Sequence, residues 1–326
     1  MKDQRKVLFL IIIAALGYFV DIYDLVLFGV VKAESLATIM PEATNELRAS
    51  TGKFLFNIQM LGMLIGGILW GVLGDKKGRL KVLFGSILLY SVANIANAFV
   101  TDIPSYTLIR LLAGIGLAGE LGAGITLISE LMPKETRGYG TMIVVTFGAL
   151  GAVTASLVGA EGQVVGAYIY KLSGWAPENW QVVYLIGGVM GLALLALRVG
   201  AFESGMFNNM ASRNDISKGD FIKLIKNKST RMKYLNCILI GLPVWYIVGV
   251  LIALSQDVFA AELGIEGVVN GKVVMYCYIG LSVGDLLSGL ISQFLKSRKM
   301  VVFIYLGMTL ALLFYYIFGA YGITRN

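Results

Sequence analysis

The sequence predicts an all-α membrane protein with nine transmembrane helices. Apolar residues make up 57% of the 326 residues, charged residues make up 14%, and the mean hydropathy is +0.77. A soluble domain of ordinary composition has about a quarter of its residues charged. Nine apolar runs between charges are each long enough to cross a bilayer as a helix of about 20 residues. We therefore expect the chain to lie in lipid.

The nine runs are separated by short charged or polar turns. In chain order they cover residues 7–31, 54–73, 82–100, 106–131, 141–160, 182–197, 234–256, 273–295 and 300–321. The first run is too long for a cleavable signal peptide and carries aspartates in its second half, so we interpret it as a retained helix. The seventh contains Pro243, which lacks a backbone N–H and is expected to kink that helix.

The distribution of Lys and Arg predicts the orientation. Placing the loops alternately on two sides gives one side 20 basic residues and the other side 6, with Arg110 inside a run. Basic residues gather on the cytoplasmic side of membrane proteins, so the N-terminus is predicted to be cytoplasmic. The net charge of +7 is then a consequence of topology and not a surface for nucleic acid.

The order of the runs predicts two membrane bundles. We expect an N-terminal six-helix bundle over residues 1–200, a basic cytoplasmic linker over 201–232 and three helices of a second bundle over 233–326. Within the linker, apolar residues alternate with lysines over 221–225. This pattern fits either a short amphipathic helix on the membrane surface or a solvated linker. Run two matches run eight at an offset of 218 residues, at Gly66 and Gly284 and at Gly71 and Gly289. Such repeats occur in transporters.

The composition also excludes several chemistries. The chain has no His, the usual metal ligand and general base, so we expect neither a zinc enzyme nor a serine-histidine triad. Cys237 and Cys277 lie inside apolar runs and predict neither a disulfide framework nor a metal site. No cofactor, no metal and no enzymatic activity are therefore expected.

Motifs at the turns resemble those of the major facilitator superfamily. The turn after run two, Gly71-Val-Leu-Gly-Asp75-Lys-Lys-Gly78-Arg79, is similar to the signature of that superfamily. Run four opens with Arg-x-x-x-Gly-x-Gly and is followed by Glu-x-x-Pro-x-x-x-Arg-Gly, as in its sugar porters, aromatic-acid/proton symporters and metabolite/proton symporters. The resemblance implies a fold of twelve helices, so the chain is expected to lack three. It also implies an inner gate that is formed by Gly71, Asp75, Gly78, Arg79, Glu130 and Arg137.

Within this superfamily, the chain resembles the branch that holds metabolite/proton symporters, aromatic-acid/proton symporters and sugar porters. The stretch around Glu120 is similar to the Gly-Gly-Glu segment of metabolite/proton symporters, and Asp21-Ile-Tyr-Asp24 resembles a motif of organic-acid symporters. The segment after run six keeps Glu203-Ser204 but lacks the prolines and arginine of sugar porters, and run five lacks the Gly-Pro pair of antiporters. Glycines at 114 and 122, with Ala118 between them, either pack against another helix or serve the motif.

Five ionisable residues lie inside the runs: Asp21, Asp24, Arg110, Glu120 and Asp285. Carboxylates in an apolar span are unfavourable unless they face a cavity or a partner. We expect Asp21 or Asp24, with Glu120, to take up a proton, and Arg110 to attract an organic anion. The aspartates could instead make hydrogen bonds between packed helices.

The predicted function is proton-coupled symport of an organic acid or other metabolite by alternating access. A sugar porter, a uniporter, or a truncated chain that folds without transporting are the alternatives. The expected partners are a small-molecule substrate, protons and the lipid bilayer, with no nucleic acid. The expected form is a monomer in a bacterial inner membrane.

Overall fold

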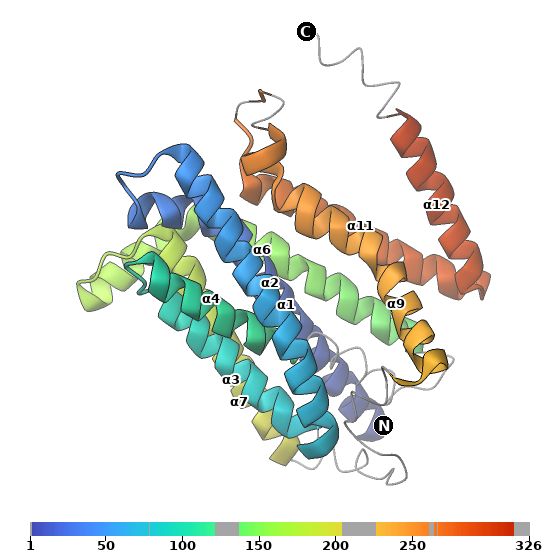
Figure 1. The fold of residues 1–326 in the computed structure, drawn as a ribbon. Coiled ribbons are helices and arrows are strands. Elements are labelled where there is room, and N and C mark those ends of the chain that lie inside the picture. The colour runs from blue at the N-terminus through green and yellow to red at the C-terminus, as the bar shows by residue number, and fades with distance from the viewer. Residues whose placement is uncertain are drawn as a thin grey trace.

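Helices form all the regular structure that the computed structural model describes, which covers residues 2–77, 79–120, 137–203, 226–260, 264–265 and 267–315. Figure 1 shows how they are arranged. The elements are α1 (Lys2–Ile39), α2 (Asn45–Lys77), α3 (Arg79–Asn97), α4 (Ile103–Leu117), α6 (Arg137–Ser173), α7 (Asn179–Glu203), α9 (Lys228–Tyr246), the π-helices η2 (Ile247–Ile252) and η3 (Ser255–Ala260), α11 (Asn270–Leu295) and α12 (Arg298–Phe314).

Helix α1 lies at the centre and contacts α2, α4, α6, α7 and α11. Most of its apolar length is buried, and its side chains contribute the largest share of the main hydrophobic core. The tightest contact is with α6, where a Cβ added at Gly151 would lie 2.0 Å from the carbonyl oxygen of Phe19. Small residues let two membrane helices approach this closely. The central position of α1 brings its two aspartates into the interior.

Helices α2 and α4 also pack backbone against backbone. A Cβ at Gly62 would lie 2.4 Å from the carbonyl oxygen of Leu111, and one at Gly114 would lie 2.2 Å from that of Gln59. The packing role that the sequence allowed for Gly114 is thus what the structure shows. This contact places Gln59 of α2 opposite Arg110 of α4.

The all-helical prediction is confirmed, whereas the count of nine spans remains a prediction. Among the described residues, six helices are long and apolar enough to cross a membrane, and the apolar parts of α3 and α4 are shorter. The predicted run 106–131 was wrong as a single helix in its described part, because α4 ends at Leu117 and residues 118–120 form a turn. The amides of Gly119 and Glu120 bond three residues back, to Gly116 and Leu117. Glycines lower helix propensity here.

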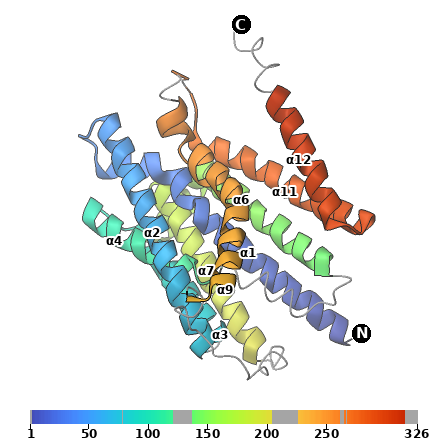
Figure 2. The same cartoon turned by 45° about the vertical axis from the view of Figure 1, so that its right-hand side comes forward.

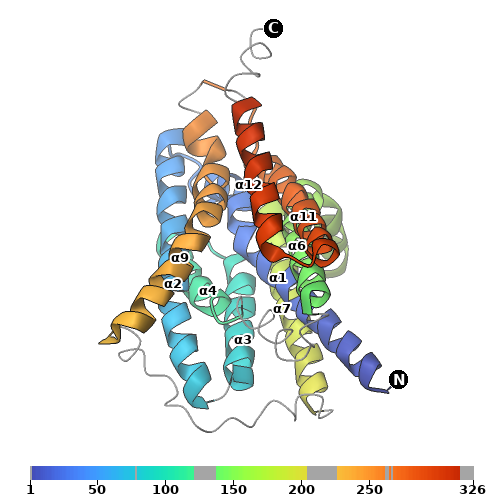
Figure 3. The ribbon, with the colours of Figure 1, turned by 90° about the vertical axis from the view of Figure 1, so that its right-hand side faces the viewer.

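The second half of the chain is packed unevenly. Helix α11 lies along α6, as Figure 2 shows, whereas α9 stands at the edge of the assembly and has no buried residue. Helix α12 runs beside α11 on the outside (Figure 3). Helices α7 and α9 extend by a few residues into the predicted linker 201–232, while the amphipathic stretch 221–225 lies outside the described residues.

Pro243 lies inside α9, and the chain changes to π-helix directly after that helix. The backbone N–H of Ile247 points at the carbonyl oxygens of both Pro243 and Val244. A π-helix has one more residue per hydrogen-bonded turn than an α-helix and occurs often at functional sites. The kink predicted at Pro243 remains a prediction, because Pro243 lies within the α-helical part and the π-helix begins only at Ile247.

Candidate functional site

A buried group of charged residues lies where α1, α3, α4 and α7 meet. The guanidinium Nη2 of Arg198, from α7, lies 2.5 Å from Oε1 of Glu120, which follows α4. The hydroxyl of Tyr90, from α3, donates to the other carboxylate oxygen of Glu120 at 3.3 Å. Asp21 of α1 lies close enough to Glu120 for the charges of the two carboxylates to act on each other. We call Asp21, Glu120 and Arg198 the carboxyl cluster.

The contact between Asp21 and Glu120 has a chemical consequence. Two ionised carboxylates that lie close together repel each other, and a proton bound by one of them removes this repulsion. Both side chains are almost completely buried, at 1% exposure each. The carboxyl cluster therefore holds two acidic side chains and one cation, Arg198, together in the interior.

Arg110 of α4 is buried among neutral partners. Its Nη2 donates to Oε1 of Gln59, and its Nη1 donates to the hydroxyl of Tyr184 at 3.4 Å. Its guanidinium carbon lies 4.6 Å from the ring centroid of Phe28 and 5.8 Å from that of Tyr184. The Tyr184 hydroxyl also shares a hydrogen bond of 2.7 Å with that of Tyr106. We call Arg110, Gln59, Phe28 and Tyr184 the guanidinium group.

Asp24 lies between these two groups. Asn94 of α3 lies beside its carboxylate, and neither carboxylate oxygen accepts a well-aligned hydrogen bond from the described residues. The charges that act on it most strongly are the attractive charge of Arg110 and the repulsive charge of Glu120. A Cβ added at Gly187 of α7 would lie 2.6 Å from its Oδ1, so the glycine makes room for the carboxylate.

The structure thus brings together the four predicted site residues Asp21, Asp24, Arg110 and Glu120. Asp285, the fifth ionisable residue in the predicted runs, lies apart on α11, where it is partly buried near Tyr18. Sequence reasoning missed Arg198, which was counted among the 20 basic residues of the predicted cytoplasmic side and is buried instead. The position of Arg198, one residue after an apolar run, was the available signal.

Two further charges were misassigned in the same way. Lys32 was placed in an extracytoplasmic loop and Asp257 just beyond run seven, yet the two form a buried ion pair. The interior therefore contains more charged residues than the five inside the predicted runs, because charges at the ends of runs were taken as solvated. Helix α1 continues to Ile39, so Lys32 lies within it.

The predicted inner gate falls mostly outside what the structure describes. Gly78 and Glu130 are outside the described residues, and the side chains of Asp75, Arg79 and Arg137 are too. Gly71 lies on α2, and a Cβ added there would meet open space. The ends of α2 and α3 at Lys77 and Arg79 agree with the tight hairpin that the motif implies.

Known proteins similar to the chain are membrane transporters. The 3-(3-hydroxy-phenyl)propionate transporter of Escherichia coli is 27% identical over 261 residues, 80% of this chain and 60% of the relative. The benzoate transport protein of Acinetobacter baylyi is 28% identical over 192 residues, 57% of this chain and 37% of the relative. The chain spans about half the length of the curated relatives it matches.

Solved structures show the same fold at low identity. The proton:xylose symporter XylE superposes with a TM-score of 0.58 at 17% identity, over 90% of this chain and 69% of that one. A bacterial homolog of the human lysosomal transporter Spinster gives a TM-score of 0.59 at 17% identity, over 88% and 63%. The family model described as Major Facilitator Superfamily matches residues 7–324. Since this match covers nearly all of the sequence, the chain belongs to the Major Facilitator Superfamily, as its motifs predicted.

Proposed function

We propose that the chain provides the proton and substrate sites of a secondary transporter that moves a small organic acid together with a proton by alternating access. The charge balance of the interior is the observation that carries this proposal. Among the residues that the structure describes, the cations that face Asp21, Asp24 and Glu120 are Arg110 and Arg198. A buried charge is strongly unfavourable unless it is paired, so the group is neutral when it holds one proton.

The charges balance separately within the carboxyl cluster and between Asp24 and Arg110. One proton shared by Asp21 and Glu120 leaves a single negative charge for Arg198. Asp24 is then left to balance Arg110. When a second proton neutralises Asp24, Arg110 loses its counter-charge and becomes the acceptor for an external anion. One proton and one carboxylate entering together keep the interior neutral, which is the physical basis of symport.

The surroundings of Arg110 suggest the class of anion. A guanidinium binds a carboxylate through two parallel hydrogen bonds, and here its present partners are the neutral groups of Gln59 and Tyr184. The rings of Phe28 and Tyr184 lie beside it and suit a flat apolar body attached to the carboxylate. The names of two relatives, a benzoate and a 3-(3-hydroxy-phenyl)propionate transporter, refer to acids of this kind. We therefore propose an aromatic carboxylic acid.

The remaining architecture is proposed with this function. Residues 1–200 and 233–326 would be two bundles joined by 201–232, with nine spans in all and the N-terminus in the cytoplasm of a bacterial cell. Asp75, Arg79, Glu130 and Arg137 would form the inner gate, and the transporter would act as a monomer. Motif resemblance and the excess of basic residues on one side support these points.

The function is tested by measuring uptake into proteoliposomes. They contain the protein that the complete reading frame encodes. We expect radiolabelled benzoate to accumulate when the outside is more acidic. Asp24→Asn, which mimics the protonated carboxyl, should exchange labelled for unlabelled benzoate without accumulating it, and Arg110→Gln should do neither. The exposed Glu46→Gln is the matched control for loss of one acid.

Three outcomes would overturn the proposal. Benzoate uptake that ignores the proton gradient would remove the coupling, and unchanged accumulation by Asp24→Asn would remove the role of that residue. Accumulation of D-xylose in place of any aromatic acid would show the sugar-porter alternative instead. Size-exclusion chromatography of each variant establishes that loss of uptake does not come from loss of the fold.

A further inference from the structure

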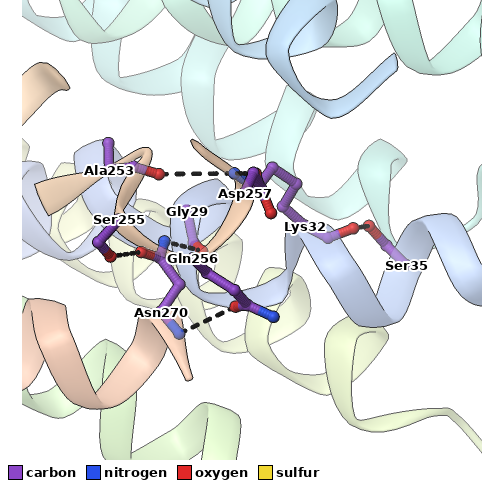
Figure 4. A network of polar contacts seen from close by, with 8 residues as sticks. All are labelled: Gly29, Lys32, Ser35, Ala253, Ser255, Gln256, Asp257 and Asn270. Carbon is purple, nitrogen blue, oxygen red and sulfur yellow. Dashed lines mark hydrogen bonds and ion pairs between the residues drawn. The ribbon is translucent and has the colours of Figure 1, made fainter. Parts of the chain in front are cut away.

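A row of buried hydroxyl groups runs from Arg110 to the backbone of α1. The guanidinium Nη1 of Arg110 lies 3.4 Å from the hydroxyl of Tyr184, which lies 2.7 Å from the hydroxyl of Tyr106. The Tyr106 hydroxyl lies 3.2 Å from Oγ of Ser35 on α1. Ser35 in turn donates to the backbone carbonyl oxygen of Lys32 at 3.1 Å, as Figure 4 shows. We call Ser35, Tyr106 and Tyr184 the hydroxyl chain.

Both ends of the hydroxyl chain fix the direction of its hydrogen bonds. A guanidinium only donates, so the oxygen of Tyr184 accepts from Arg110. A carbonyl oxygen only accepts, so the hydrogen of Ser35 points at Lys32. Because each hydroxyl has a single hydrogen, Tyr184 then donates to Tyr106, and Tyr106 donates to Ser35. Every hydroxyl therefore accepts from the side of Arg110 and donates away from it.

The side chains of the hydroxyl chain are held in place by their surroundings. All three are 0% exposed. The ring of Tyr106 packs edge-on against those of Phe28 and Tyr184, with centroid separations of 5.8 and 6.3 Å. The ring of Trp180 packs edge-on against Tyr184 at 6.3 Å. Side chains in a close-packed interior keep their rotamers. The hydroxyl chain can therefore change its direction by rotating its hydrogens, without any movement of its heavy atoms.

We propose that the hydroxyl chain reverses when a carboxylate binds to Arg110, so that Tyr184 becomes a second donor to the substrate. This inference rests on the function proposed above and adds a specificity-determining residue to it. The Tyr184 hydroxyl lies beside Nη1 of Arg110, and so also beside a carboxylate oxygen that Nη1 binds. In the reversed chain, Ser35 donates to Tyr106 and Tyr106 donates to Tyr184. The hydrogen of Tyr184 is then free for the carboxylate.

Reversal leaves no donor of the hydroxyl chain without an acceptor. Before it, the last acceptor is the carbonyl oxygen of Lys32; after it, the last acceptor is the carboxylate. The Lys32 carbonyl keeps a partner because it lies inside α1, where each carbonyl accepts from the N–H four residues later. A neutral acceptor is thus exchanged for a charged one, which forms the stronger hydrogen bond. The exchange favours a carboxylate over a neutral solute of the same shape.

Removal of single hydroxyls tests the reversal, because the expected effects have opposite signs. Tyr184→Phe removes the donor to the carboxylate and should weaken benzoate binding about tenfold or more. Tyr106→Phe and Ser35→Ala each remove an acceptor of the resting chain, which leaves a hydroxyl hydrogen unsatisfied until a carboxylate binds. We expect these two variants to bind benzoate about twofold to tenfold more tightly than the parent. The affinities are measured by calorimetric titration of the complete protein in detergent micelles.

The sign of the change separates this role from a merely structural one. A structural role predicts weaker binding by every variant, so the proposal is overturned if the folded Tyr106→Phe and Ser35→Ala bind no more tightly than the parent. Parent-like binding by folded Tyr184→Phe overturns it as well. Either of the two acceptor variants carries the test if the other fails to fold. Tyr168→Phe, which removes an exposed hydroxyl on α6, should leave the affinity unchanged.

Failure of the proposed function gives a different result in the same titration. If Arg110→Gln binds benzoate as the parent does, or if neither binds it, the anion site at Arg110 is wrong and the reversal is overturned with it. If Arg110→Gln loses binding while Tyr184→Phe keeps it, the anion site stands and only the reversal is overturned.

Discussion

The guanidinium of Arg198 lies 2.5 Å from the carboxylate of Glu120, and the two side chains come from elements that are 78 residues apart in the sequence. Both are buried, at 6% and 1% side-chain exposure. Neither charge can be hydrated in this position, so each is stabilised by the other. The pair therefore ties α7 to the turn that follows α4, beside Asp21 of α1.

Arg198→Met should destabilise the protein by about 3–5 kcal/mol, because it leaves Glu120 buried without its cation. The double variant Arg198→Met with Glu120→Gln should recover most of this loss, since it removes both charges. Unfolding in mixed micelles of increasing SDS fraction measures the free energies. If the double variant is as unstable as the single one, the pair is not the reason for the loss.

Gly17→Ala should disturb the same ion pair from the α1 side. A Cβ at Gly17 would lie 1.8 Å from Nη2 of Arg198 and 2.8 Å from Oε1 of Glu120, so the ion pair must shift. Overpacking of this kind costs about 1–3 kcal/mol. The matched control is Gly67→Ala on α2, where a Cβ meets open space, and which should be neutral or stabilising by up to about 1 kcal/mol. Equal effects of the two changes in the same unfolding assay would rule out the crowding argument.

Gly114→Ala should loosen the contact between α2 and α4. The added Cβ would lie 2.2 Å from the carbonyl oxygen of Gln59, and a backbone atom cannot move aside as a side chain can. We expect the free energy of unfolding to fall by about 1–3 kcal/mol. We also expect a raised KM for benzoate, because Gln59 would be displaced from Arg110. Gly67→Ala on α2, where a Cβ meets open space, is the control. An unchanged KM would show that the contact between α2 and α4 does not affect substrate binding at Arg110.

Much of this arrangement was predictable from local patterns, and the rest was not. Asp21 and Asp24 were predicted as site residues because carboxylates in an apolar helix are unfavourable unless they face a cavity or a partner. Arg110 and Glu120 were predicted from their motifs. Arg198, Lys32 and Asp257 were missed because residues at the ends of apolar runs look like topology charges until the helix length is known. Gln59 and Tyr184 carry no sequence signal, since their role comes only from the glycine contact that brings α2 onto α4 and from the packing of α7.

We expect the stability of the protein to depend on pH through Asp102, which lies outside the membrane-spanning segments. The backbone N–H of Ser105 donates to its carboxylate at 2.8 Å and the Ser105 hydroxyl at 2.8 Å, which caps α4 and lowers the pKa of Asp102. A lowered folded-state pKa adds stability above the ordinary carboxyl pKa and loses it as pH falls through the lowered value. Asp102→Ala should therefore be less stable than the parent near neutral pH. This difference should disappear in acid, as measured by SDS unfolding at several pH values, and a difference independent of pH would exclude the carboxylate as its cause.

Gln59→Glu should block the anion site from within. The amide oxygen of Gln59 already accepts from Nη2 of Arg110, so a carboxylate in the same place would become a permanent internal counter-ion. The substrate carboxylate would then have to displace a charged group held beside the guanidinium, and a like charge nearby would repel it. We expect at least a tenfold weaker affinity for benzoate, about 1.4 kcal/mol, in a calorimetric titration. Gln163→Glu adds the same charge at an exposed position of α6 and should leave the affinity unchanged. Parent-like binding by folded Gln59→Glu would place the substrate away from Arg110.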